Sequence, residues 1–324
     1  MTSCFQVLQI IADGNTHSGQ KLSGALGVSR AAIWKHIHKL ESHGVDISKE
    51  KGRGYKLAAP LELLNQTQIM ARLTAEQQAL LTHLYVESVV DSTNALAMQD
   101  IEQELSGSVW LAEQQTAGRG RRGRGWVSPF GANIYLSALW KISGGAGQLG
   151  GLSLALGVAL VEALAALGVI GLALKWPNDI VFERKKLGGI LVEMQGDAAG
   201  DCHVVVGIGM NVKMPASAAQ HIDQEWTDIK SICDVVPGRN ELAATLTGAV
   251  LELLSRYTVT GFAPYASRWN ALDALQDTAV SVQIGADVIT GVAKGAAADG
   301  ALRLETAKGM RVFHGGEVSL RAQI

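Results

Sequence analysis

The sequence has few cysteines, no strongly basic leader and no long uninterrupted apolar run. Its three cysteines, Cys4, Cys202 and Cys233, lie far apart and form no CxxC pair, which argues against a zinc site and against a disulfide framework. The first residues, MTSCFQVLQIIADGN, have neither the basic region nor the small-residue cleavage site of a secretory signal. We therefore expect a cytoplasmic protein with reduced thiols.

The longest apolar stretch, residues 149–174, is interrupted by Ser153, Glu162 and five glycines. A membrane-spanning helix needs about 20 consecutive apolar residues, so we expect a buried helix that runs into a strand, and no membrane partner. The whole chain has 324 residues, of which 48% are hydrophobic and 18% charged. This composition is typical of a globular protein with two or three domains.

Charge is unevenly distributed, although the formal net charge is only −2. Residues 1–60 contain eight Lys and Arg against four Asp and Glu, so this segment carries +4 and the remainder −6. A basic module joined to an acidic body predicts contact with a polyanion through the module alone.

The basic module has the pattern of a helix-turn-helix. Apolar residues recur at helical spacing in FQVLQIIADG, a second short helix ends near Gly27, and Ser29 is placed to cap a third helix. In that third helix Ile33, Ile37 and Leu40 fall on one face, which we expect to point into the core.

The opposite face of the third helix and the segment after it carry the candidate DNA contacts. GVDISKEKGRGYKLAAP alternates around two glycines, which predicts a β-hairpin wing. Basic groups on both elements favour DNA over a winged helix that binds only protein; Trp34 fits either a groove contact or packing between domains. The residues expected to contact DNA are Ser29, Arg30, Ala31, Trp34, Lys35, His38, Lys39, Lys51 and Arg53.

Beyond the winged helix-turn-helix the pattern changes twice. A polar, helix-rich connector is followed by short β-type runs mixed with helical stretches, which predicts an α+β domain whose mixed sheet has helices on one face. The last short strands, with frequent turns, predict a small SH3-like β-barrel. The expected boundaries of winged helix, connector, α+β domain and barrel are 1–60, 61–84, 85–270 and 271–324.

The segment GRGRRGRGW, residues 118–126, sets four arginines among four glycines. Glycine lets a backbone approach a ligand closely, like charges favour a mobile loop, and guanidinium groups suit phosphate or carboxylate. Spacing alone leaves three interpretations open: an RGG-type nucleic-acid segment, a dinucleotide-binding GxGxxG fingerprint and a phosphate-clamping loop. The flanking predicted strands weigh against the first, and the lack of a following helix weighs against the second.

Four motifs, in this order, resemble those of biotin protein ligases: DSTN (91–94), AEQQTAGRGRRGRGWVSPFGANIYLS (112–137), LKWPNDIVFERKKLGGILVE (174–193) and GIGMNV (207–212). The winged helix makes the chain similar to the bifunctional bacterial class, in which the ligase also represses the biotin operon. The resemblance covers essentially the whole chain and is most specific in the arginine segment and KWPND.

The resemblance implies a two-step reaction. Biotin's carboxylate attacks the α-phosphate of ATP to give biotinoyl-5'-adenylate and pyrophosphate, with Mg²⁺ carrying the pyrophosphate; a lysine amine of biotin carboxyl carrier protein then takes the acyl group and AMP leaves. It implies that Arg119, Arg121 and Lys186 are catalytic, because positive groups must bring two anions together. It also implies a homodimer, coupled to adenylate binding, that recognises operator DNA.

The same resemblance implies the substrate contacts. Ser92, Thr93, Asn94 and Gln115 would hold the ureido and ring end of biotin, although Ser92 and Asn94 could instead cap the following helix. Trp126 would stack on adenine. No residue is expected to be a metal ligand. The full set of expected contacts is Ser92, Thr93, Asn94, Gln115, Gly118, Arg119, Gly120, Arg121, Arg124, Trp126, Lys175, Asn178, Asp179, Lys186, Gly189, Asn211 and Trp226.

Two other functions remain open on the sequence. A non-catalytic biotin-sensing transcription factor would keep the winged helix and the pocket, but it would not need the arginines and Lys186 together. A lipoate ligase shares the broad architecture of the catalytic domain. The complete GRGRRGRGW and KWPND motifs weigh against it.

Overall fold

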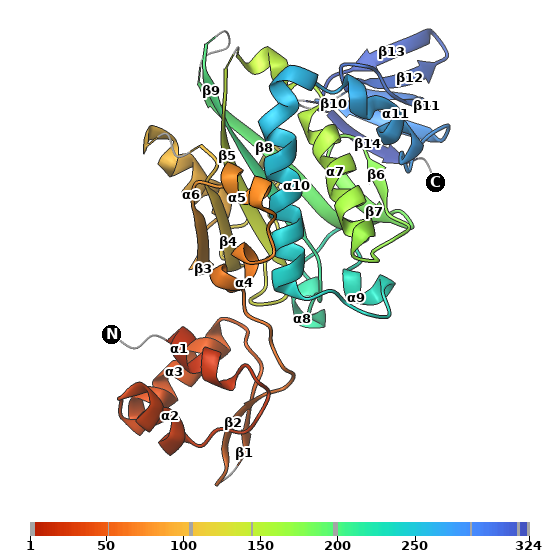
Figure 1. The fold of residues 1–324 in the computed structure, drawn as a ribbon. Coiled ribbons are helices and arrows are strands. Elements are labelled where there is room, and N and C mark those ends of the chain that lie inside the picture. Colours follow the sequence, from red (N-terminus) through yellow and green to blue (C-terminus); the bar gives the residue numbers. More distant parts are fainter. Residues whose placement is uncertain are drawn as a thin grey trace.

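The computed structural model describes residues 4–50, 52–103, 106–143, 145–196, 200–285, 287–315 and 318–322. They form a small amino-terminal domain, a seven-stranded sheet with helices, and a carboxyl-terminal five-stranded sheet (Figure 1). Within these residues, no helix has the length and apolar character needed to cross a membrane. The three cysteines are free thiols, as predicted.

The small domain is a helix-turn-helix followed by a two-stranded wing, as predicted. Ser29 Oγ accepts a hydrogen bond from the Ala32 amide (3.2 Å) and caps the third helix, in which Ile33, Ile37 and Leu40 are fully buried. The elements are α1 (Cys4–Ile11), α2 (Gly19–Leu26), α3 (Arg30–Ser42), β1 (Ile47–Glu50) and β2 (Gly54–Leu57).

The large sheet is mixed, as predicted, because its first two strands are parallel and all other neighbours are antiparallel. The parallel edge strand was not predicted; it lies at the expected domain boundary. The strand order is β3 (Leu84–Val90), β4 (Val109–Gln115), β5 (Ile134–Ile142), β9 (Cys202–Met210), β8 (Lys185–Gly196), β7 (Asp179–Phe182), β6 (Ala173–Lys175).

Helices cover both faces of this sheet, so the prediction of helices on one face is wrong. α7 (Leu152–Ala166) and α10 (Arg239–Thr260) pack on one face, and α6 (Thr93–Gln99) packs on the other. The physical reason is that successive side chains of a strand point to opposite faces of the sheet, and in the central strands the side chains on both faces are apolar. Leu111 points into the large core, whereas its neighbour Trp110 packs with the α6 side.

The carboxyl-terminal sheet is antiparallel throughout. Its inner residues, such as Val280 and Leu304, belong to the same hydrophobic core as the large sheet, so the two sheets are packed as one body. The strand order is β13 (Gly309–Phe313), β12 (Leu302–Thr306), β11 (Asp287–Ala296), β10 (Ala279–Ile284), β14 (Val318–Ala322). Short helices complete the chain: α4 (Gln66–Met70), α5 (Ala75–Leu80), α8 (Ala216–Ala219), α9 (Ile229–Ile232) and α11 (Ala263–Ala271).

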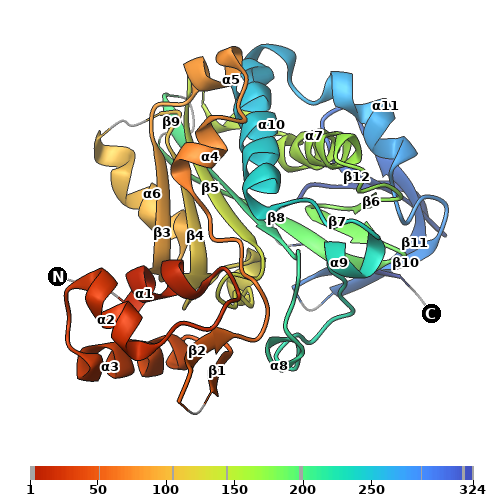
Figure 2. The ribbon, with the colours of Figure 1, turned by 60° about the horizontal axis from the view of Figure 1, so that its bottom comes forward.

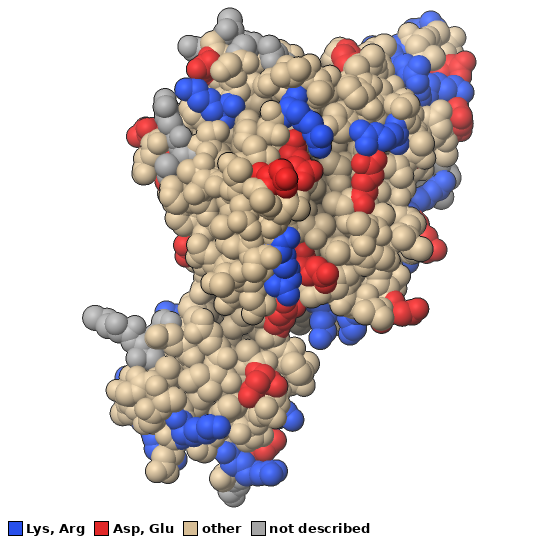
Figure 3. All heavy atoms as spheres, viewed as in Figure 1, with Lys and Arg blue, Asp and Glu red and all other residues tan. Residues whose placement is uncertain are grey.

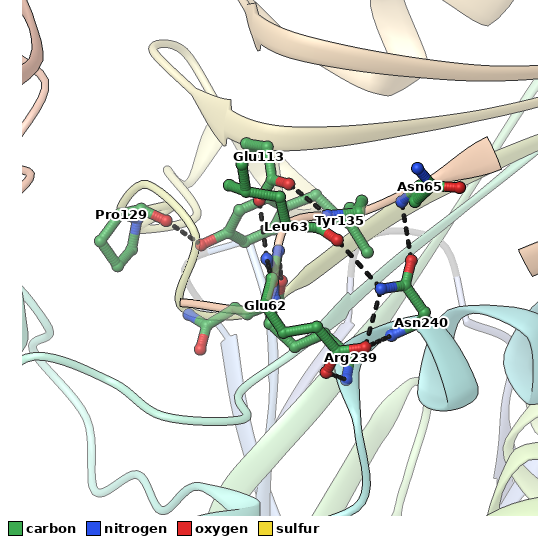
Figure 4. A network of polar contacts seen from close by, with 10 residues as sticks. Glu62, Leu63, Asn65, Glu113, Pro129, Tyr135, Arg239 and Asn240 are labelled. Atoms are coloured by element: carbon green, nitrogen blue, oxygen red, sulfur yellow. Dashed lines mark hydrogen bonds and ion pairs between the residues drawn. The ribbon is translucent and has the colours of Figure 1, made fainter. Parts of the chain in front are cut away.

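The connector between the small domain and the large sheet is tied to the start of α10 (Figure 4). The Glu62 carboxylate accepts hydrogen bonds from the amides of Arg239 (2.6 Å) and Asn240 (3.2 Å), the first two residues of that helix. Gly238, at the N-cap, has no side chain for this role. Glu62 therefore caps the longest helix from outside, where the helix dipole favours a negative charge.

Arg239 links the connector to β4 and to the residue that precedes β5. Its guanidinium donates to Glu113 Oε2 (2.7 Å) and to the carbonyl oxygens of Glu62 (2.8 Å) and Asn133 (2.9 Å), while Glu113 Oε1 accepts from the Leu64 amide (2.5 Å). The side chains of Arg239 and Glu113 are 7% and 6% exposed. A buried charge pair of this kind is tolerated because nearly every polar atom has a partner.

The small domain contacts the large one at the end of β4. His43 Nδ1 lies 3.0 Å from Gln114 Oε1, and the Phe5 ring stacks on Phe130 at a centroid distance of 5.6 Å. Trp34 takes no part in this contact: it is 53% exposed. Of the two roles expected for Trp34, the prediction of packing between domains is therefore wrong.

Candidate active site

A single cavity of about 960 Å³ brings the sequence motifs together. It lies over the ends of the central strands and is lined by the arginine segment, the β3–α6 turn, KWPND and the segment around Trp226. Every residue predicted to contact a substrate lines this cavity. The volume is within the range of sites for small molecules and cofactors.

The cavity is strongly cationic. Among its lining residues six are basic and two are acidic, so the site is suited to a ligand with several negative charges. The six are Arg119, Arg121, Arg122, Arg124, Lys175 and Lys186, and the two are Asp179 and Asp223.

The polar end of the cavity is formed by the turn between β3 and α6. The Thr93 amide and hydroxyl donate to Gln115 Oε1 (2.9 and 3.1 Å), and Gln115 Nε2 donates to Ser128 Oγ (3.0 Å). Ser92 is at the N-cap of α6 but its side chain makes no capping hydrogen bond. The alternative prediction, that the Ser92 side chain caps the helix, is therefore wrong.

Asn94 is held from two sides by residues that sequence reasoning missed. Its Nδ2 donates to Glu193 Oε2 (2.8 Å), and its Oδ1 lies 2.5 Å from Ser137 Oγ. A Cβ on Gly207 would come within 2.1 Å of Asn94 Oδ1. The sequence contained one signal for this contact. The alternating glycines of GIGMNV leave room on one face of a strand, and that strand pairs with the strand that carries Glu193.

The arginine segment folds as a short hairpin over the cavity. The Trp126 amide donates to the Gly118 carbonyl (2.8 Å), the Gly120 amide donates to the Arg124 carbonyl (2.7 Å), and Arg122 has a left-handed backbone (φ 58°). Its mobility in solution stays a prediction.

Two arginines join this hairpin to the rest of the molecule. Arg119 Nη2 donates to Glu193 Oε2 (3.0 Å). Arg121 donates to Asn178 Oδ1 (3.2 Å) and to the Gly315 carbonyl in the carboxyl-terminal sheet region (3.0 Å). Burial lowers the pKa of Arg121, and Asp179 opposes that effect. Arg121 thus links three parts of the fold across the mouth of the cavity.

Lys186 faces the hairpin from β8. Its Nζ lies 2.8 Å from Asp179 Oδ1 and 5.4 Å from the centre of the Trp126 ring. The Lys186 side chain is 18% exposed. Asp179 therefore orients a cation that points at the indole and at the space between the motifs.

Trp126 packs against two glycines. A Cβ at Gly209 would come within 2.4 Å of the indole, and one at Gly189 within 3.3 Å. The buried indole nitrogen has no hydrogen-bond partner among the described residues. Glycine at these two positions leaves room for a ring to stack against the sheet.

The far end of the cavity carries amides. Asn178 Nδ2 donates to the Ile190 carbonyl (2.8 Å), and Asn211 Nδ2 donates to the Thr227 carbonyl (3.0 Å). Asn211 Oδ1 is buried and has no partner within the described residues, so it is an acceptor available to a ligand. The backbone around Trp226 pairs with Lys186, which brings that indole to the same place.

The candidate DNA-contacting residues form one outer face of the small domain. α3 lies beside the wing, away from the large sheet (Figure 2), and Lys and Arg side chains gather at this end of the molecule (Figure 3). Lys51 lies outside the described residues. The other eight are exposed: Ser29, Arg30, Ala31, Trp34, Lys35, His38, Lys39 and Arg53.

Comparisons with known proteins agree with this division. Residues 5–56 match an HTH domain family, residues 86–211 the biotin/lipoate A/B protein ligase family, and residues 278–321 the biotin protein ligase C terminal domain.

Related proteins extend the agreement to the whole chain. The bifunctional ligase/repressor BirA of Escherichia coli is 40% identical and aligns over 98% of this chain and 97% of its own length; that of Bacillus subtilis is 30% identical over 94% and 93%. The biotin protein ligase of Aquifex aeolicus, solved with biotin and ATP, covers 74% of this chain and 99% of its own, with 29% identity and a TM-score of 0.63. The chain therefore belongs to the biotin protein ligase family, with bifunctional ligase/repressors among its full-length relatives.

Proposed function

We propose that this protein is an ATP-dependent biotin protein ligase and a biotin-operon repressor. The observation that carries the ligase function is the convergence of the arginine hairpin, Lys186 and the Ser92–Gln115 polar end on one cationic cavity. A pocket that only senses biotin needs no cation pair at its centre. The same convergence therefore favours catalysis over a non-catalytic sensor.

The proposed first step joins two anions. The ureido end of biotin binds at Ser92, Thr93, Asn94 and Gln115, and its carboxylate points toward Lys186. Adenine lies on Trp126 and donates its amino group to Asn211 Oδ1. Arg119, Arg121 and Lys186 neutralise the carboxylate and the α-phosphate, so that the carboxylate oxygen displaces pyrophosphate in line.

In the proposed second step, the amine of one carrier lysine attacks the acyl carbon, an amide bond forms, and AMP leaves with the electron pair of the broken C–O bond. Gly118, Gly120 and Arg124 complete the hairpin that covers the adenylate and keeps water away. Lys175, Asn178, Asp179, Gly189 and Trp226 support the nucleotide side.

Magnesium is proposed to enter on the triphosphate, as part of the substrate. Within the described residues, no three His, Cys, Asp or Glu side chains come together to hold a metal ion. Asp179, one of the two carboxylates that line the cavity among the described residues, is paired with Lys186. The protein's own cations then share the charge of the polyphosphate with the ion.

The remaining proposals concern partners and domains. Residues 1–60 bind operator DNA, 61–84 connect, 85–270 catalyse, and 271–324 form an SH3-like barrel. The acceptor is biotin carboxyl carrier protein. A cytoplasmic homodimer that forms when adenylate is bound would set two winged helices on a palindromic operator.

The direct test is to incubate the protein with ATP, magnesium, biotin and a biotin-carrier domain, and to follow AMP release and carrier mass. We expect the mass of one biotinoyl group on one lysine. A carrier that stays unmodified would contradict the ligase function. ATP–pyrophosphate exchange is also measured with lipoate in place of biotin. Exchange that occurs with biotin but not with lipoate would exclude a lipoate ligase.

Lys186→Met tests the central cation. We expect biotin-dependent ATP–pyrophosphate exchange to fall by about 100- to 1,000-fold, because one preorganised charge on the transition state is lost. Lys185→Met, which removes an exposed lysine from the preceding position, is the matched control and should exchange at the parent rate. Equal rates for the two variants would remove Lys186 from the mechanism.

A further inference from the structure

The exposed face of α3, which carries most of the candidate DNA contacts, includes an indole. Trp34 is 53% exposed and is the one aromatic residue among the large apolar side chains that are exposed in the described part of the chain. It lies on α3 with Arg30, Lys35 and Lys39 around it, all exposed. Side chains of Lys and Arg suit phosphate contacts, whereas an exposed indole can contact base edges in a groove.

Trp34 is paired with His38. Their ring centroids are 4.1 Å apart and the rings meet edge to face at 71°. The two residues are one helical turn apart on α3, so both side chains reach the same place. A contact of this kind holds each ring in one orientation while both remain exposed.

Glu41 sets the hydrogen-bonding role of the imidazole. His38 Nδ1 lies 2.9 Å from Glu41 Oε2, and Lys49 Nζ of the wing lies 2.9 Å from Glu41 Oε1. A carboxylate only accepts hydrogen bonds, so Nδ1 donates to it. In the neutral imidazole Nε2 then has the lone pair and accepts. The surface thus offers an apolar ring beside one hydrogen-bond acceptor.

An A·T pair matches both groups. Its major-groove edge presents both the N6 amino group of adenine and the thymine methyl group, with the thymine O4 acceptor between them. A G·C pair presents an amino group without the methyl. We propose that Trp34 and His38 together read one A·T pair in each operator half-site, with the indole against the thymine methyl and His38 Nε2 accepting from adenine N6. This inference rests on the proposed DNA-binding function.

Replacing single atoms of the DNA tests the proposal. Duplexes bound by the full-length protein with biotin, ATP and magnesium are selected from a random library, and each thymine is replaced in turn by uracil. At one pair per half-site we expect uracil to weaken parent binding about four-fold, the equivalent of about 0.8 kcal/mol for one buried methyl group. The affinity of Trp34→Ala should not change on that replacement.

The amino group is tested at the same pair with 2-aminopurine, which moves it from C6 to C2. We expect weaker binding by the parent and no change for His38→Ala. Lys35→Ala is the control: it should weaken binding to all duplexes alike, lower the salt dependence, and keep the uracil effect.

If every uracil replacement changes the affinity of the parent and of Trp34→Ala equally, Trp34 does not recognise the thymine methyl group. If 2-aminopurine changes the affinity of the parent and of His38→Ala equally, His38 does not recognise the adenine amino group. Failure of the parent to bind any duplex would contradict the DNA-binding function itself, and this inference with it.

Discussion

Arg121→Gly is expected to release the adenylate and to spread biotin onto lysines of proteins that are not carriers. Arg121 is the residue that joins the hairpin to Asn178 and to the Gly315 carbonyl. Charged hydrogen bonds of this kind contribute about 1.5–3 kcal/mol each. Loss of one such bond corresponds to about 10- to 150-fold, and the substitution removes both. We therefore expect the intermediate to escape at least about ten-fold faster and to react in solution with any accessible amine.

The measurement is mass spectrometry of a lysine-rich bystander protein incubated beside the carrier domain. Arg122→Gly is the matched control, because it removes the same charge from the same hairpin. Arg122 already has a left-handed backbone, which glycine adopts without strain. We expect bystander labelling to rise at least ten-fold with Arg121→Gly and to stay near the parent level with Arg122→Gly. Labelling by Arg121→Gly that stays on a single carrier lysine would refute the clamp.

Arg239→Met is expected to cost about 3–5 kcal/mol of unfolding free energy. It leaves the Glu113 carboxylate buried without its cation, and such single removals are far more damaging than loss of an exposed pair. The exposed pair Arg268–Glu162 supplies the control, because its 2.8 Å distance is close to the 2.7 Å of the buried pair while both of its side chains are about half exposed. Arg268→Met should cost at most about 1 kcal/mol.

A second substitution separates charge from packing. In Arg239→Met with Glu113→Gln the buried charge is gone, and the amide oxygen can still accept from the Leu64 amide. We expect the double variant to recover part of the loss in urea unfolding of the full-length protein. Arg239→Met within about 1 kcal/mol of the parent would mean that water or a rearranged side chain neutralises Glu113.

The sequence predicts local features of this fold well. Ser29 caps α3, Gly27 ends α2 in the left-handed conformation, and the two glycines of the wing lie at its tip and at the start of β2. Each depends on a few neighbouring residues, which is why pattern alone suffices. The four ligase motifs also marked the cavity, because each one occupies a strand end or a turn.

Contacts between distant segments could not be predicted in this way. Glu62 and Arg239 are 177 positions apart, and nothing near either residue indicates the other. The same holds for Asn94 and Glu193, 99 positions apart. The sequence did not predict that α6 covers the second face of the sheet. A short apolar run has the same pattern whether helices cover one face of a sheet or both faces.

The way the connector is held determines where the chain can be shortened. Cutting after Asn65 would remove the carboxylate that caps α10 and the Leu64 amide that satisfies Glu113. Cutting before Leu61 would keep both. A ligase freed of its DNA-binding module should therefore start no later than Leu61, and residues 61–65 belong to the enzyme although their sequence resembles a linker.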